Sequence, residues 1–166
     1  MANAQRGRSR VVVSSLLEQL DEAYDRQSWH GTNLRGSLRG LSADHALWRP
    51  VPDRHNVWEI VIHAAYWKYA AWRRLTGEKR GAFPHKGSNW IPSPISPTDA
   101  EWRDAVALLG DFHRMLREAI ARLSDADLRR RAPGGKETIG RLVRGIAAHD
   151  LYHAGQIQLL KRLLRS

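Results

Sequence analysis

Apolar residues recur at helical spacing in four separate stretches of this chain, and no stretch alternates apolar and polar residues as a half-buried strand does. The stretches cover about 16–38, 56–76, 98–123 and 137–164. Helical spacing gathers the apolar side chains on one face of each helix, and that face has to pack against other such faces. The sequence therefore predicts an all-α protein that forms an antiparallel four-helix bundle.

Capping residues and helix breakers mark where these helices begin and end. Asn56 with Glu59, and Thr98 with Glu101, have the spacing of capping boxes at helix starts. Gly77 ends the second pattern, and breakers then crowd the chain at Gly77, Gly81, Pro84, Gly87, Pro92, Pro94 and Pro97. Because proline and glycine oppose a continuous helix, we expect a long Pro/Gly-rich crossover loop between helices 2 and 3.

The length of 166 residues suits one domain with a single core. We assign 11–166 to this domain and 1–10 to a flexible basic arm, because the first ten residues are polar and basic. Glu59, His63 and Lys68 interrupt the most apolar stretch, so we expect no membrane span. No signal-peptide cleavage site follows the short apolar run 11–13, and we therefore expect a cytoplasmic protein.

The chain contains no cysteine, so it has no disulfide, no thiolate zinc site and no cysteine nucleophile. A metal ion would have to be bound by histidine or carboxylate. Of the eight histidines, His113 is expected to border the core and is only a reserve candidate for a ligand. Four others lie in helix ends, connections or loops, where we expect exposure to solvent: His30, His45, His55 and His85.

The remaining three histidines are the candidate metal ligands. His149 and His153 are four residues apart, which places both rings on one helix face, close enough to bind one ion. His63 shares the apolar face of the second helix. Such a pair also arises by chance as core residues, but buried imidazoles are costly unless they are hydrogen-bonded or bound to metal. The sequence thus indicates a three-histidine site for zinc, nickel, cobalt, manganese or iron.

Several segments resemble the DinB/YfiT superfamily of four-helix bundles. They are the stretch from Trp58 to Trp67, the helix end from Arg73 to Gly77, the loop Trp90-Ile91-Pro92 and the pattern His149-Asp150-Leu151-Tyr152-His153-Ala154-Gly155-Gln156-Ile157. The resemblance implies that His63, His149 and His153 form the metal triad, with zinc or nickel as the usual ion. It also implies a homodimer, which apolar loop residues such as Ile91 and Ile95 favour.

Residues beside the triad are candidates for supporting roles. Glu59 lies one turn before His63 and could accept the second ring N–H of His63 or a proton, or it could simply cap the helix. The Gln156 amide could point at the site or line the bundle. We assign Tyr152 and Trp67 to the core as aromatic residues, and we expect Asp150 to face solvent, away from the site.

Three histidines leave coordination positions open, which favours catalysis over a structural role. Members of the resembled superfamily include bacillithiol- and mycothiol-type S-transferases and proteins described as metal-dependent hydrolases. We place the transferase, with a low-molecular-weight thiol as its small-molecule partner, ahead of the hydrolase, because no HExxH motif supplies a general base. The net charge of +10 also permits nucleic-acid binding, but no known recognition motif accompanies it. A metal-free interaction protein is the third alternative.

Overall fold

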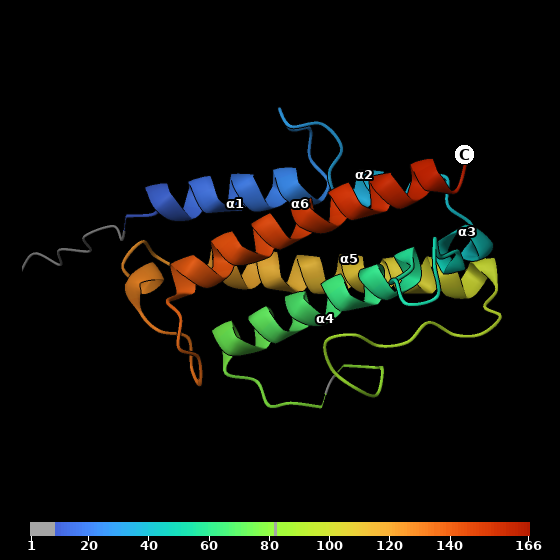
Figure 1. Ribbon diagram of the computed structural model, residues 1–166. Coiled ribbons are helices and arrows are strands. Elements are labelled where there is room, and N and C mark those ends of the chain that lie inside the picture. The colour runs from blue at the N-terminus through green and yellow to red at the C-terminus, as the bar shows by residue number, and fades with distance from the viewer. Residues whose placement is uncertain (1–8, 82) are drawn as a thin grey trace, which may run out of the picture.

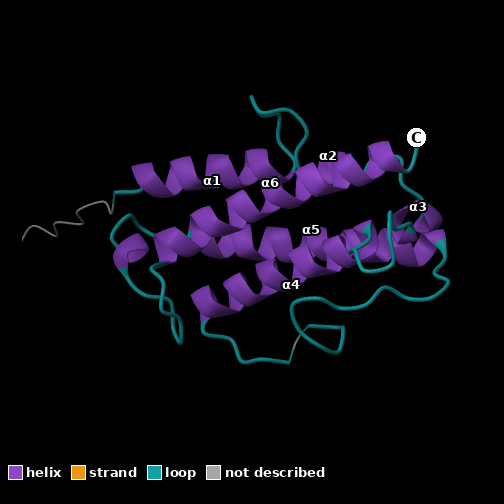
Figure 2. Cartoon of the chain, in the orientation of Figure 1, coloured by secondary structure: helices purple, strands orange, loops and turns teal. Residues whose placement is uncertain are grey.

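The computed structural model describes residues 9–81 and 83–166 and shows a bundle of long helices (Figure 1). The long helices are α1 (Val11–Tyr24), α4 (Val57–Thr76), α5 (Asp99–Ala121) and α6 (Ile139–Leu163). Short helices occupy the connections: α2 (Leu34–Ser37), α3 (Ala43–Leu47) and the 3-10 turn η1 (Asp127–Arg129). No strand occurs within the described residues, as Figure 2 shows. The predicted all-α bundle is confirmed.

The four long helices run in two directions, with α1 and α6 parallel to each other and antiparallel to α4 and α5 (Figure 1). Ring contacts confirm that α4 and α5 are parallel, since Trp58 meets Trp102 near their beginnings and Tyr69 meets Phe112 about three turns later on both helices. Two successive parallel helices need a connection that returns along the bundle. The predicted Pro/Gly-rich crossover loop between α4 and α5 makes this return.

The predicted helix ends are largely confirmed by their capping contacts. The Asn56 side chain accepts a hydrogen bond from the Glu59 amide, and Gly77 closes α4 with a φ of 80°. This positive φ explains the glycine, because other residues adopt it at a cost. Thr98 and Glu101 form a complete capping box at the start of α5. At α4 only half of the box forms, because the Glu59 carboxylate bonds elsewhere.

The prediction of one helix over 16–38 was wrong. Helix α1 ends at Tyr24, and the chain resumes a helical turn only at Leu34. Asn33 enforces this break, since its side chain accepts from the Gly36 amide to cap α2 and donates to the Arg26 carbonyl. Leu34 and Leu38 still enter the core, so their spacing matched the helical period without a continuous helix.

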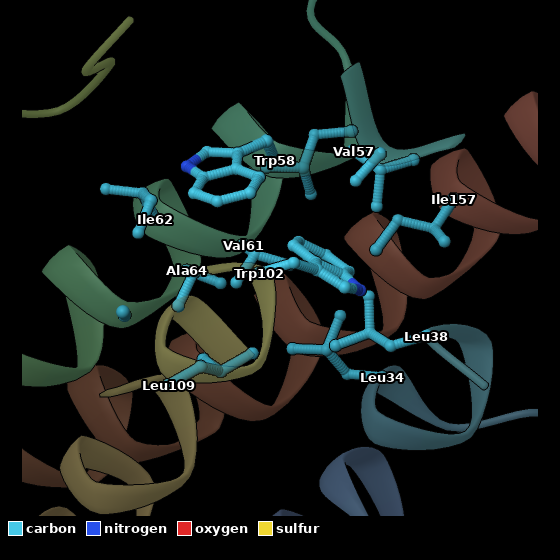
Figure 3. Close-up of a cluster of buried hydrophobic side chains, with 14 of the residues drawn as sticks. Leu34, Leu38, Val57, Trp58, Val61, Ile62, Ala64, Trp102, Leu109 and Ile157 are labelled. Atoms are coloured by element: carbon cyan, nitrogen blue, oxygen red, sulfur yellow. The ribbon is translucent and has the colours of Figure 1, made fainter. Parts of the chain in front are cut away.

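Buried aromatic and aliphatic side chains from α2, α4, α5 and α6 fill one half of the core (Figure 3). Trp102 lies at its centre, and its indole N–H donates to the Leu41 carbonyl at 2.9 Å, which satisfies the buried donor. A second cluster joins α1 to α6 around Leu20, Ile120 and Val143. The two clusters fix α4 against α6, the helix pair that carries the candidate ligands.

The structure tests only part of the predictions of a basic arm and of a dimer contact. The predicted arm 1–10 lies outside the described residues except for Ser9 and Arg10, which bond to Asp125 and to the Ala121 carbonyl. Ile95 is exposed, but Ile91 is buried in the core, so Ile91 does not offer a dimer contact. Dimerisation itself stays a prediction. None of the helices in the described part of the chain is long and apolar enough to cross a membrane.

Candidate metal centre

His63, His149 and His153 meet between α4 and α6. The Nε2 atom of His149 lies 3.0 Å from Nε2 of His63 and 3.0 Å from Nε2 of His153. All three ligand atoms lie within 4.8 Å of one another. The prediction that these three side chains converge is confirmed. Among the described residues, no carboxylate joins this group.

Hydrogen bonds fix which ring nitrogens face the centre. Nδ1 of His63 lies 3.0 Å from the Asn89 carbonyl, and Nδ1 of His153 lies 2.7 Å from Oε1 of Gln156. Both oxygens can only accept, so each Nδ1 carries the proton and donates it. The Nε2 atoms of His63 and His153 therefore both present lone pairs to the centre.

This arrangement of lone pairs fits a cation. His149 has at most one Nε2 proton, so it can donate to one neighbouring Nε2 atom but not to both. Without a cation, one pair of nitrogen atoms at 3.0 Å would place lone pair against lone pair. A divalent ion at about 2.0–2.1 Å from each nitrogen would remove this repulsion. The donor set suits zinc, nickel, cobalt, manganese or iron.

Burial keeps the three imidazoles neutral, which is the form that binds metal. It lowers the pKa of His63 to about 4, although the Asn89 carbonyl opposes the shift. It lowers the pKa of His149 to about 3, aided by the neighbouring His153 and His63. The pKa of His153 is lowered by the same cause. Protons therefore compete with a metal for these rings only in acid.

The crossover loop holds His63 in place from the outside. The Trp90 ring lies between two imidazoles, stacked on His63 at 3.8 Å and on His55 at 3.6 Å between ring centroids. Asn89, at φ 62°, turns its carbonyl toward His63, while its side chain accepts from the Trp67 indole N–H. We had not predicted these contacts, because the loop has no periodicity that would orient its residues.

Glu59 does not contact the second ring nitrogen of His63, contrary to one predicted role. Its carboxylate receives two hydrogen bonds from Arg49, at 2.6 and 2.9 Å, and one from His55 at 3.0 Å. Burial alone would raise the pKa of Glu59, but these bonds lower it to about 2. His55 was expected to be exposed to solvent. Its ring is about half exposed, but it also hydrogen-bonds Glu59. Arg49 and His55 thus tie the connection before α4 to the first turn of α4.

Gln156 contacts His153, and Tyr152 supports that contact from outside. The Gln156 amide donates to the Tyr152 hydroxyl at 3.1 Å while its carbonyl accepts from His153. The assignment of Tyr152 to the core was wrong, because 64% of its surface is exposed. Gln156 thus orients a candidate ligand and does not itself lie among the three converging nitrogens.

Asp150 is fully buried, so the prediction that it faces solvent was wrong. It lies 2.5 Å from Nζ of Lys68, whose side chain is also buried, and this partner on α4 makes its burial tolerable. Lys68 also donates to Nδ1 of His113 at 3.2 Å, and the His113 ring stacks on Tyr24. His113 is thus a core residue, as expected, and belongs to the ion-pair cluster and not to the triad.

A cavity of about 580 Å³ opens beside His149. Its walls come from the second half of α4, the loop before α6 and the first half of α6. On α6 the lining residues fall on one helix face: Arg141, Leu142, Gly145, Ile146 and His149. A small molecule in this cavity would reach the triad at His149.

Comparison with protein families settles the relationship that the geometry indicates. The family model described as the DinB superfamily matches residues 24–157, which include all three histidines. The chain belongs to the DinB superfamily. Neither the curated proteins nor the solved structures gave a significant match to it. The matched range thus covers every residue of the candidate centre.

Replacing Gln156 by alanine should weaken metal binding without abolishing it. His153 would lose the partner that fixes its ring, and losing such an outer contact typically costs 10- to 100-fold in affinity. We expect a fall of about that size for Gln156→Ala in competition titrations with a chromogenic chelator. Gln158→Ala, on the same helix, is the matched control. Equal affinities of the two variants would show that Gln156 does not orient the ligand.

Proposed function

We propose that this protein is a metal-dependent transferase that joins a low-molecular-weight thiol to an electrophile. His63, His149 and His153 would hold the ion, and the observation that supports this most strongly is the convergence of their three Nε2 atoms. Among the described residues, no fourth ligand completes the set, so positions on the ion stay open for a substrate. A bound divalent ion would supply Lewis acidity, which favours the thiolate over the thiol.

The protein's own residues would position and shield the reactants. Asn89 and Gln156 hold two of the rings through their Nδ1 atoms, so that only Nε2 atoms face the ion. Trp90 covers one side of His63 and limits the access of water there. The thiol would enter through the cavity beside His149, and the absence of cysteine means that the attacking sulfur must come from a substrate.

Hydrolysis is the alternative reaction, because water can occupy the same open position. The state of Glu59 favours transfer to a thiol. Its carboxylate is bonded to Arg49 and His55 and has a pKa of about 2, which makes it a weak proton acceptor. No other carboxylate joins the triad in the described part of the chain.

The test compares thiol transfer with hydrolysis in the same preparation. Metal-loaded protein is assayed with a panel of bacterial thiols and small electrophiles, and in parallel with esters, amides and lactones. We expect conjugation that needs both metal and thiol and that is lost in His153→Ala. His45→Ala, which changes an exposed histidine on α3, should keep the activity. Thiol-independent hydrolysis would favour the alternative, and activity without metal would remove the triad from the mechanism.

A further inference from the structure

The cavity beside His149 has a strongly basic lining. Three of its lining residues are cationic, Arg74, Lys136 and Arg141, and one is anionic, Glu137. Trp67, Leu142, Ile146 and Ala132 supply apolar wall. This mixture suits a small molecule with an apolar body and a few polar anchoring groups. Arg74 comes from the end of α4, Lys136 from the loop before α6 and Arg141 from the first turn of α6, and these segments lie at one end of the bundle (Figure 1).

Two of the three cations have no acidic partner in the part of the chain that the structure describes. Arg141 pairs with Glu137 at 3.2 Å, and both side chains are largely exposed. Within the described residues, Arg74 and Lys136 form no ion pair, and the guanidinium of Arg74 lies 6.0 Å from the centre of the Trp67 ring. The cavity thus holds a net positive charge that no described side chain neutralises. An anionic ligand would meet a favourable potential along this wall.

The position of Arg141 sets how far a ligand's anionic group lies from the ligand atom that reaches the triad. Arg141 lies eight residues before His149 on α6, which is about 12 Å along the helix axis. Gly145 lies between them, and a Cβ atom added there would meet nothing within 4 Å. The missing side chain leaves the path from the cations to the triad open.

We infer that the cavity binds an anionic thiol, whose carboxylate or phosphate contacts Arg74, Lys136 and Arg141 while its sulfur reaches the triad at His149. The identity of the reacting end rests on the proposed function, whereas the anion site rests on the charges and the cavity alone. The anionic group lies several ångströms from the sulfur in such a ligand, because Arg141 and His149 are about two helical turns apart on α6.

The experiment measures binding by calorimetry to protein of verified metal content. The probes are 8-mercaptooctanoate and 8-mercaptooctan-1-ol, which share a chain and a thiol and differ in the charge of the far end. We expect the wild-type protein to bind the acid about tenfold more tightly than the alcohol, since charge-assisted contacts are the strong ones. Equal binding of acid and alcohol would overturn the anion site and leave the transferase proposal standing.

Charge variants test which residues contact the anion. Lys136→Glu should remove the advantage of the acid, while Lys79→Glu, an equal charge change outside the cavity, should keep it. Glu137→Gln should enlarge the advantage, because it releases Arg141 from its present partner. An acid advantage that survives Lys136→Glu and does not grow in Glu137→Gln would overturn the assignment.

A steric pair tests the path along α6. Gly145→Leu should weaken binding of both thiols about tenfold or more while the metal content stays unchanged. Gly155→Leu is the matched control, because it is a glycine on the same helix with open space and lies outside the cavity. Unchanged binding to Gly145→Leu would show that the thiol lies elsewhere.

Suberate separates failure of this inference from failure of the proposed function. This dicarboxylate has no thiol, so its binding reports the anion site alone. Suberate binding that weakens in Lys136→Glu, together with binding of 8-mercaptooctanoate that is no tighter than that of suberate and does not depend on the metal, would support the anion site and overturn the thiol transferase. If neither suberate nor the thiols bind, both proposals are overturned.

Discussion

Purified protein should carry about one divalent ion per chain, and His149→Ala should carry almost none. The Nε2 atom of His149 lies 3.0 Å from both other Nε2 atoms, so its loss leaves two donors on different helices. Loss of an outer hydrogen-bonding partner already costs 10- to 100-fold in affinity. Loss of a ligand should therefore weaken binding by more than about 100-fold. Elemental analysis of protein made without a histidine tag measures the metal content of each variant.

Other histidine variants make this result specific. His113→Ala and His45→Ala should keep the ion, because neither side chain belongs to the converging group. The ion should also stabilise the fold, since it joins α4 to α6, and an ion at a thousand times its Kd adds about 4 kcal/mol. Full metal retention in the double variant His149→Ala, His153→Ala would refute the site. Identical melting of metal-free and metal-loaded protein would refute tight bridging.

The triad was predictable because it follows from helical spacing. His149 and His153 share a face by their interval, and His63 shares the apolar face of its own helix. The capping residues Asn56 and Thr98 were equally predictable, because a cap is a local interaction. Local rules thus placed two helices and brought the three candidate ligands to positions that face one another.

What the sequence did not reveal depends on contacts between distant segments. Asp150 was assigned to solvent because it adjoins His149 in sequence and should face away from the site, whereas it is buried with Lys68 of α4 as its partner. Asn89 and Trp90 lie in an aperiodic loop, so no pattern could direct them onto His63. The break after Tyr24 was missed because Leu34 continues the leucine spacing on a separate helix.

Removing one partner of the buried pair Lys68 and Asp150 should cost more stability than breaking any surface ion pair. Both side chains are almost completely inaccessible, and Oδ1 of Asp150 has no hydrogen-bond partner among the described residues, so the carboxylate depends on Lys68. Burial raises the pKa of Asp150 and lowers the pKa of Lys68, and their attraction opposes both shifts. Lys68→Met should therefore cost about 3–5 kcal/mol, measured by urea unfolding of metal-free protein at pH 7.

A double variant and a change of pH distinguish lost pairing from lost packing. Lys68→Met with Asp150→Ala should be more stable than Lys68→Met alone, because no unpaired charge stays buried.

In Lys68→Met the pKa of Asp150 in the folded state should lie far above its unfolded value, since burial is then unopposed. The folded state then binds a proton that the unfolded state releases, so stability falls as pH rises through the range between the two pKa values. The deficit of Lys68→Met relative to wild type should accordingly shrink between pH 7 and pH 5. Loss of Lys68 also removes a charge that lowers the pKa of His113, and this change acts in the same direction. The alternative result is a deficit that does not change with pH, together with effects of Lys68→Met and Asp150→Ala that add in the double variant. It would mean that Lys68 contributes through packing of its methylene groups and not through its charge.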